Sequence, residues 1–300
     1  MTDTDTRSDD DRTDADTERE RPSVLVPLAV LEGEVLPDGV PELLATTHVV
    51  LLGYHEIPDQ TAPGQARMQF EERALAKLDD VQAVLEGAGA TVERRLVFTH
   101  RPQQTFDRQI AEHGCDAVFV PGSVGELDEV LVAIRGEVGL DRITNFVAGL
   151  VGGTDLGVIL YHLRGPDETE EHAAALLEVA SDHLVDHGVP PGAIERRIDS
   201  ADEIKPVDAI AGLADDCDAV VMGETDPSVA TYVFGMPSKQ VADRFLGPVL
   251  VVQREPEAPE EEPGTEEGEV GAGDGDVGTE EEKPGPEEGD EASTNPEEEP

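Results

Sequence analysis

The feature that most constrains the fold is an internal repeat, because four short segments recur in the same order about a hundred residues apart. "VLVPL" from Val24 returns as "VLVAI" from Val130, and "CDAVFVPG" from Cys115 returns as "CDAVVMG" from Cys217. "EGEV" and "HVVLLGYHEIP" return as "RGEV" and "GVILYHLRGP", and the offsets run from 102 to 109 residues. A period of this length is that of a whole domain, so the sequence predicts two copies of one unit.

Each copy alternates short apolar runs with longer segments of helical period. Val24–Leu28, Val49–Gly53 and Ala117–Val120 are rich in Val, Leu and Ile, as strands buried on both faces are. Residues 69–90 and 170–189 carry apolar residues at helical spacing and have glycine near their ends. This alternation predicts an α/β fold with a Rossmann-like, doubly wound parallel sheet in each copy, and ligands outside the carboxyl ends of the strands.

The two copies differ at their carboxyl-terminal ends. After Gly122 the first copy has only "SVGELDE" before the second copy begins, so it is predicted to lack the last helix and strand. The second copy continues through a loop to a helix near 238–245 and a strand at 248–252. The predicted division is an acidic tail at 1–22, a first unit at 23–128, a second unit at 129–253 and an acidic tail at 254–300.

The chain is strongly acidic even without its two tails. Its formal net charge is −47, and residues 23–253 alone keep 39 acidic against 15 basic side chains. Self-repulsion at this charge opposes folding in dilute salt, whereas molar salt screens it within about 3 Å. The composition indicates a cytoplasmic protein of an extreme halophile; the alternative is an acidic protein that mimics nucleic acid or binds basic partners. An acidic surface argues against nucleic acid and anionic membrane as partners.

Both tails are expected to be disordered. Residues 254–300 consist mainly of Glu, Gly, Pro and Asp, which bury too little apolar surface to offset chain entropy. Residues 1–22 contain no apolar stretch of the kind found in signal peptides. In the whole sequence no apolar run reaches the roughly 18 residues that a membrane-spanning helix needs, so a membrane protein is not expected.

The repeated unit and the end of the second copy resemble the universal stress protein family in its tandem form. The resemblance spans about residues 23–253 and rests on "VLVPL", "TVERRLVFTH" and "DAVFVPG" in the first copy and on "VMGETDPSVATYVFGMPSKQVADRFLGPVLVV" in the second. It implies a five-stranded parallel sheet, dimer-like association between units and a role in the response to stress. For some members of the family it also implies ATP binding.

The members that bind ATP carry a loop of the pattern Gly-x2-Gly-x9-Gly-Ser/Thr, whose N–H groups and hydroxyl hold the phosphates. Gly223 fits the first position of this pattern, Asp226 stands at the second glycine, and Gly235 stands near the third. An acidic side chain at the second position would repel phosphate. Two interpretations of the residues that follow stay open. Either Ser238 and Lys239 replace the missing phosphate ligands, or Ser238 caps the helix and Lys239 lies on its solvent-exposed face.

Two further positions depart from the ATP-binding pattern. Met236 stands where the hydroxyl is expected, and Arg135 lies in the segment where such members have an Asp that helps to hold the base and ribose. No cofactor is therefore expected, and ATP is the alternative. The candidate nucleotide-binding residues are Arg135, Gly223, Asp226, Gly235, Ser238 and Lys239.

Other side chains do not assemble into a catalytic or metal site by their spacing. His183 and His187 lie four residues apart, which is the spacing of half a zinc site, but no third ligand is apparent and no metal is expected. Cys115 and Cys217 precede matching strands and are interpreted as packing residues. No nucleophile, base and orienting group can be combined, so an enzyme is not expected.

The sequence as a whole predicts a non-catalytic regulatory or stress-response protein. It would act through association of its two units, packed as an internal pseudo-dimer, and a homodimer is a further form of association. The alternative is a nucleotide-binding module that holds ATP at the glycine loop of the second unit.

Overall fold

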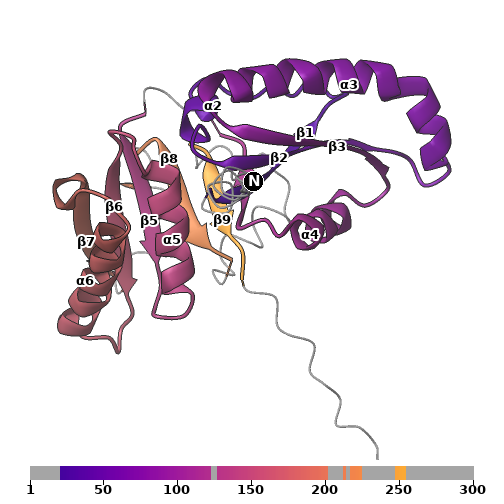
Figure 1. Cartoon of the computed structure of the whole chain (residues 1–300). Coiled ribbons are helices and arrows are strands. Elements are labelled where there is room, and N and C mark those ends of the chain that lie inside the picture. The colour runs from indigo at the N-terminus through magenta and orange to yellow at the C-terminus, as the bar shows by residue number, and fades with distance from the viewer. Residues whose placement is uncertain (1–20, 123–126, 202–211, 214–216, 225–246, 255–300) are drawn as a thin grey trace, which may run out of the picture. The chain divides into compact units, whose positions relative to one another are not determined.

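The computed structural model describes residues 21–122, 127–201, 212–213, 217–224 and 247–254 (Figure 1). All of these belong to the single compact unit Met1–Pro256, and the remaining segment, Glu257–Pro300, lies outside the described residues. Both tails predicted from the sequence also lie outside them, apart from Arg21, Pro22 and Arg254. The predicted helix near 238–245 lies outside them as well.

The described strands form one sheet of nine strands in the order β3-β2-β1-β4-β9-β8-β5-β6-β7. All neighbouring strands pair in parallel except β4 and β9, which pair antiparallel. The predicted α/β fold with a mostly parallel, doubly wound sheet is therefore confirmed. The strands are β1 (Ser23–Ala29), β2 (His48–Glu56), β3 (Thr91–Thr99), β4 (Ala117–Val120), β5 (Glu129–Ile134), β6 (Gly157–Arg164), β7 (Ile194–Ser200), β8 (Ala219–Gly223) and β9 (Val249–Val252).

The strand register is the same in the two halves of the sheet. In the first half Val24 pairs with Val49 on one side and Ala117 on the other, and Val49 pairs with Val92. In the second half the corresponding partners pair in the same way: Val130 with Val158 and Ala219, and Val158 with Ile194. The repeated segments of the sequence therefore occupy matching positions, and a residue of β1 can be related to its counterpart in β5.

Strand β9 lies between the two halves and pairs with both. Its register places Val249 beside Val220 of β8 and beside Val120 of β4. The described residues between β4 and β5 contain no helix or strand. Among the described residues, the first half has no fifth strand of its own beside β4. Strand β9 of the second half pairs with β4 instead, and the sheet is therefore continuous.

Glycine allows β4 to meet the start of β9. A Cβ atom on Gly122 would lie 2.2 Å from the Gly247 carbonyl oxygen and 2.6 Å from the Pro248 nitrogen. Real Cβ contacts are not this short, so any other side chain at this position would push the two backbones apart. The glycine that follows the first "CDAVFVP" thus serves the junction between the halves.

Helices cover both faces of the first half. Helix α3 (Pro63–Ala88), with the short α2 (Val40–Leu43), packs on one face of β1–β3, and α4 (Pro102–His113) packs on the other (Figure 1). The helix expected within 69–90 is present and begins earlier, at Pro63, because proline is favoured in the first turn of a helix. Gly89, with φ of 119°, ends it in the left-handed conformation that glycine adopts readily.

In the described part of the second half, two helices cover one face of the sheet. Helix α5 (Leu140–Val151) and helix α6 (Glu170–Asp186) bury one side each against β5, β6 and β8, and a 3-10 turn (Pro191–Ala193) precedes β7. The predicted helix at 170–189 is thereby confirmed. Its start is fixed by Thr169, whose hydroxyl accepts a hydrogen bond from the His172 N–H at 3.2 Å.

Both cysteines are free thiols, with Cys115 buried and Cys217 half-buried. Burial raises the pKa of Cys115 to about 11, so this thiol stays protonated and inert near neutral pH. Among the described helices none is both long and apolar enough to cross a membrane.

Candidate functional site

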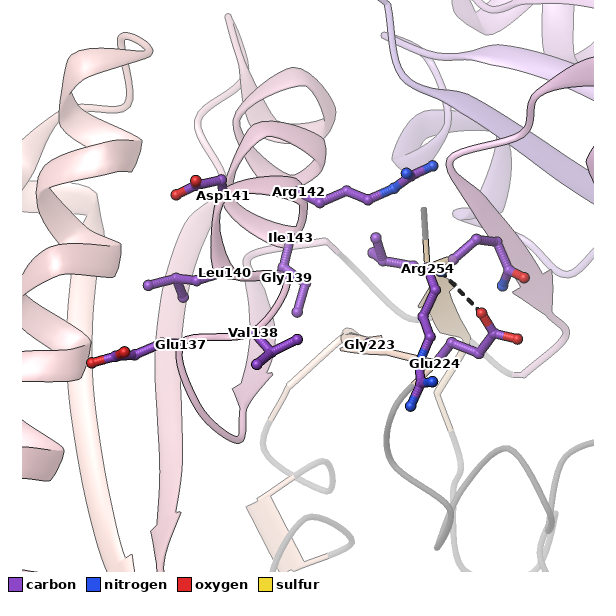
Figure 2. A pocket seen from close by; sticks show the side chains of 12 residues that line it. Glu137, Val138, Gly139, Leu140, Asp141, Arg142, Ile143, Gly223, Glu224 and Arg254 are labelled. Carbon is purple, nitrogen blue, oxygen red and sulfur yellow. Dashed lines mark hydrogen bonds between the residues drawn. The ribbon is translucent and has the colours of Figure 1, made fainter. Parts of the chain in front are cut away.

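A cavity of about 520 Å³ opens at the carboxyl ends of β8 and β9. Its wall consists of the β5–α5 loop and first turn of α5 (137–143), Gly223 and Glu224 after β8, and residues 252–254 at the end of β9 (Figure 2). This is the edge of a doubly wound sheet where ligands commonly bind, beside the strand at which the order of connections reverses.

Helix α5 begins in the wall of this cavity. Gly139 precedes the helix with a φ of 75°, and its carbonyl oxygen accepts the first helical hydrogen bond from the Ile143 N–H at 3.1 Å. No side chain caps the helix by a hydrogen bond, and the first N–H of the helix, that of Leu140, donates to the Glu137 carbonyl oxygen at 3.2 Å. The aligned peptide dipoles give this end of α5 a partial positive charge that favours an anion.

Charged side chains of both signs surround the opening. Arg142 and Asp141 point to opposite sides of α5, with Arg142 on the side of Arg254 and Glu224 (Figure 2). The guanidinium of Arg142 lies 3.8 Å from the carboxylate of Asp116, at the start of β4. A Glu224 carboxylate oxygen accepts a hydrogen bond from the Arg254 N–H at 2.9 Å. The arginines partly offset the acids, and Arg142 links the cavity wall to the first half.

Of the six candidate residues of the sequence, two are described. Gly223 ends β8, pairs with Val252 and lines the cavity. Arg135 is exposed and begins the β5–α5 loop, but it does not line the cavity. The other four candidates, Asp226, Gly235, Ser238 and Lys239, lie outside the described residues.

Arg142 and Arg254 were not predicted from the sequence as members of this wall. On a helix and at a strand end, single arginines look like solvated surface residues, so no local signal marks them. The glycine-rich start of α5 was visible in "RGEVGLD", and the repeat of "GEV" in both halves pointed to this loop.

A contact between buried His162 and partly exposed Glu168 lies next to the loop that begins at Arg135. His162 in β6 lies opposite Ile134 in the register and is 2% exposed. Its Nδ1 is 2.8 Å from the Ile134 carbonyl oxygen, and its Nε2 is 2.9 Å from a carboxylate oxygen of Glu168. Both ring nitrogens therefore have an oxygen acceptor within hydrogen-bond distance. The pair ties the loop after β6 to the end of β5.

Burial acts to raise the pKa of Glu168, but hydrogen bonds from His162 and the Gly165 N–H and the charges of His162 and His172 outweigh it. The pKa of Glu168 is therefore below its usual value. Ionised Glu168 is thus stabilised by the contacts that fix this loop.

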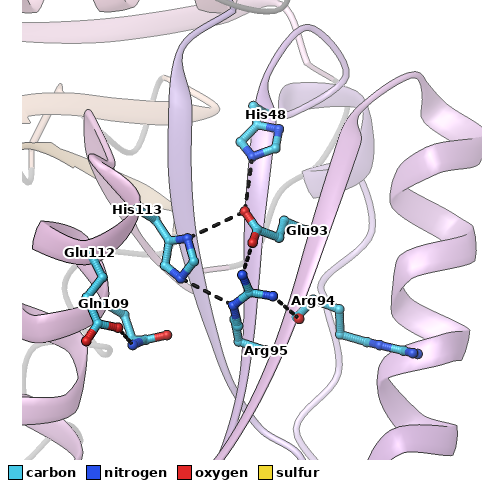
Figure 3. Close-up of polar contacts among 7 residues, drawn as sticks. All are labelled: His48, Glu93, Arg94, Arg95, Gln109, Glu112 and His113. Atoms are coloured by element: carbon cyan, nitrogen blue, oxygen red, sulfur yellow. Dashed lines mark hydrogen bonds and ion pairs between the residues drawn. The ribbon is translucent and has the colours of Figure 1, made fainter.

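A second polar cluster lies in the first half, away from the cavity wall. A Glu93 carboxylate oxygen is 3.5 Å from His113 Nδ1 and 3.8 Å from His48 Nε2, while Arg95 contacts the other oxygen (Figure 3). Arg95 Nε also donates to His113 Nε2 at 3.3 Å. These contacts join β2, β3 and the end of α4. The cluster contains no nucleophile with a base beside it, and we interpret it as structural.

The two histidines considered for zinc are engaged in other contacts. His183 Nδ1 lies 3.0 Å from an Asp141 carboxylate oxygen, and His187 Nδ1 lies 2.7 Å from the His183 carbonyl oxygen. Within the described part of the chain, no group of three or more His, Cys, Asp or Glu side chains is arranged to hold a metal ion.

Comparison with solved structures supplies the class of fold. The chain is similar to a universal stress protein from Archaeoglobus fulgidus DSM 4304, with a TM-score of 0.53 and 18% identity over 77% of this chain and 96% of that one. A putative universal stress protein from Pseudomonas aeruginosa UCBPP-PA14 gives a TM-score of 0.43 and 18% identity over 79% and 94% of the two chains. A universal stress protein in complex with cAMP gives 0.34 and 24% over 43% and 98%.

No protein-family model matches the chain, and no curated protein matches it significantly. The architecture is that of a doubly wound α/β protein with a cavity at the carboxyl edge of the sheet. More narrowly, the likeness to the Archaeoglobus fulgidus structure shows that the chain has the universal stress protein fold.

Proposed function

We propose that this chain is a tandem universal stress protein, with one unit at 23–128 and the other at 129–253. The observation that carries the proposal is the common register of the two halves, in which Val24 and Val130 have corresponding neighbours on both sides. Two unrelated domains would have no reason to share it. The similarity to a universal stress protein that covers 77% of this chain supports the same reading.

We propose further that the protein acts through association of its two units and not through catalysis. The supporting contacts join the halves at several places besides β4 and β9. Thr46 donates its hydroxyl to the Leu150 carbonyl oxygen at 2.7 Å, and the Gln253 N–H donates to the Asp116 carbonyl oxygen at 2.7 Å. The units would form an internal pseudo-dimer. Because β9 is paired on both sides, a homodimer of this chain would have to use another surface.

The proposal includes a cytoplasmic, salt-adapted setting without nucleic acid or membrane as partner. Its basis is the net charge of −47 and the acid that remains when the tails are set aside. We propose no enzymatic role, because the contacts described above include no nucleophile paired with a general base.

Native mass spectrometry of the full chain, purified and held in molar salt, tests this proposal. We expect the mass of the unmodified chain with no stoichiometric nucleotide, and no turnover of ATP on prolonged incubation. A chain that carries one equivalent of ATP or AMP through purification would favour the alternative below. Steady ATP hydrolysis by the purified chain would contradict the non-catalytic proposal.

The alternative function is nucleotide binding at the cavity of the second half. A volume of about 520 Å³ suits a ligand of nucleotide size, and the first turn of α5 and Gly223 lie in its wall. The exposed Val138, also in the wall, offers a test that leaves the core intact. If a nucleotide binds, Val138→Asp should weaken ATP binding about tenfold in calorimetric titrations. The counterpart Val35→Asp in the first half is the matched control and should change nothing.

A further inference from the structure

The two outer edges of the sheet carry the same short pattern of an apolar residue, a glutamate, two arginines and a second apolar residue. Arg94 at the centre of the pattern in β3 lies opposite Leu51 of β2, and Arg196 at its centre in β7 lies opposite Leu160 of β6. Among the described strands, β3 and β7 stand at the two ends of the order and pair on one side. The two patterns are Val92-Glu93-Arg94-Arg95-Leu96 and Ile194-Glu195-Arg196-Arg197-Ile198.

The backbone of β3 has hydrogen-bonding groups along its outer side. The Thr91 N–H donates to the residue before β2, and the Thr99 carbonyl oxygen accepts from the residue after it. The odd-numbered residues of β3 therefore bond to β2. Successive residues of a strand direct their N–H and C=O groups to opposite sides. The groups that point away from β2 thus belong to Val92, Arg94, Leu96 and Phe98.

Arginine side chains contact two of these outward carbonyl oxygens. Arg95 Nη1 donates to the Arg94 carbonyl oxygen at 3.2 Å, and Arg67 of α3 donates to that of Leu96 at 3.3 Å. A carbonyl oxygen has two lone pairs, so each of them can accept a backbone N–H as well. The edge is therefore able to pair with a further strand.

The charged side chains of the pattern divide between the two faces of the sheet. Arg94 points toward α3, where it contacts Asp79, and Glu93 and Arg95 contact each other on the opposite face (Figure 3). Strand β3 carries two arginines and one glutamate, whereas residues 23–253 as a whole carry 39 acidic and 15 basic side chains. A second copy of this acidic chain meets less repulsion here than over the rest of the surface.

The pattern is complementary to itself when two β3 strands run antiparallel about Arg94. Glu93 then lies opposite Arg95 of the second copy, and Arg95 opposite its Glu93, so two ion pairs form by symmetry. On the α3 face Val92 lies opposite Leu96, and each central Arg94 keeps its contact with Asp79 of its own chain. In a register centred on Leu96 the two ion pairs would be lost.

Strand β3 suits this pairing better than β7 does. It has nine residues against seven in β7, so more backbone groups can pair. After the pattern, β3 continues with the apolar Val97 and Phe98, whereas β7 continues with Asp199. The acids and bases of β7 are equal in number, while in β3 the bases exceed the acids.

We propose that two copies of this chain associate through antiparallel pairing of their β3 strands, centred on Arg94. The sheet of one copy then continues into the sheet of the other, while β4 and β9 stay paired within each chain. The inference rests on the proposed function in one respect, that the chain acts by association. It adds the partner, a second copy, and the surface that this partner uses.

Sedimentation equilibrium of the full chain in molar KCl, over a range of concentrations, tests the inference. The wild type should show an equilibrium of monomer and dimer. Arg94→Pro removes the central outward N–H and leaves the hydrogen bonds to β2 in place, so the dimer should dissociate about tenfold more readily. Arg196→Pro, the corresponding change in β7, is the matched control and should leave the dissociation constant unchanged.

Two results of this experiment would overturn the inference. One is a wild type that is monomeric at every concentration, which would leave the proposed internal pairing of β4 with β9 standing. The other is a folded Arg94→Pro variant that dimerises as strongly as the wild type.

Cysteine cross-linking decides the question even if Arg94→Pro does not fold. In the proposed register the two Arg94 Cα atoms lie opposite each other at about 5.5 Å, which a disulfide can span. Oxidised Arg94→Cys should therefore form a covalent dimer. Arg196→Cys should stay as little cross-linked as the wild type, whose own thiols are Cys115 and Cys217. Cross-linking of both variants equally, of neither, or of Arg196→Cys alone would overturn the inference.

Discussion

At the scale of single residues, the aspartate of each repeated "CDAV" segment accepts backbone hydrogen bonds at the start of the first strand of its half. In the first half an Asp116 carboxylate oxygen accepts a hydrogen bond from the Ser23 N–H at 2.8 Å. In the second half an Asp218 carboxylate oxygen accepts from the Asp128 and Glu129 N–H groups at 2.7 and 2.9 Å. Each aspartate therefore fixes the start of the first strand of its half, and the cysteine before it packs beside the sheet.

Removing the carboxylate of Asp218 should lower the stability of the protein without changing its fold. Asp218→Ala leaves two N–H groups at the start of β5 without their acceptor, so the free energy of unfolding should fall by about 1–3 kcal/mol. Urea unfolding in molar KCl measures the loss. Asp155→Ala, at an exposed position, is the control and should change stability little. If the free energy of unfolding falls equally in the control and in Asp218→Ala, the hydrogen bonds of Asp218 make no specific contribution to stability.

The ion pair of His162 and Glu168 gives the stability a defined dependence on pH. Since the pKa of Glu168 is lowered on folding, its contribution is present above the unfolded value near 4.5 and is lost as pH falls through the lower, folded value. Glu168→Gln should therefore reduce the melting temperature near neutral pH, and the difference from the wild type should shrink in acid. The exposed Glu178→Gln is the matched control. An equal difference at every pH would contradict the assigned linkage.

At the scale of the elements, the strands and the two long helices could be predicted because their residues carry the pattern locally. Val49–Gly53 is apolar throughout, and the end of α3 is marked by Gly87 and Gly89. The antiparallel pairing of β4 with β9 was not predicted, because "AVFV" and "VLVV" fit either direction and their partners lie over 100 residues apart. The cavity edge could be predicted from the strand order, but Arg142 and Arg254 could not, since only tertiary packing brings them together.

The junction between β4 and β9 depends on a glycine, which a substitution can test. Gly122→Ala would place a Cβ atom 2.2 Å from the Gly247 carbonyl oxygen, so the two strands must separate and the free energy of unfolding should fall by about 1–3 kcal/mol. At Gly136 an added Cβ meets nothing within 4 Å, and Gly136→Ala is the control. Equal melting temperatures for the two variants would argue against close contact at the junction.

At the scale of the whole molecule, the excess of acid should make folding depend on salt. Residues 23–253 carry 39 acidic and 15 basic side chains, and their mutual repulsion is screened only at high ionic strength. We expect the melting temperature to rise steadily between dilute buffer and molar KCl. A melting temperature that does not change over this range would remove the argument for a halophilic source.

The central claim is that the two units associate as one sheet through β9, and native-state hydrogen exchange in molar KCl tests it most directly. If β9 holds both halves, the amides of Ala117–Val120 and Val249–Val252 should exchange only with the global free energy of unfolding, like those of the β1–β2 pair. Faster exchange of the β4 and β9 amides that bond to each other, with β1–β2 and β8–β9 still protected, would show that the halves separate. That result would contradict the account.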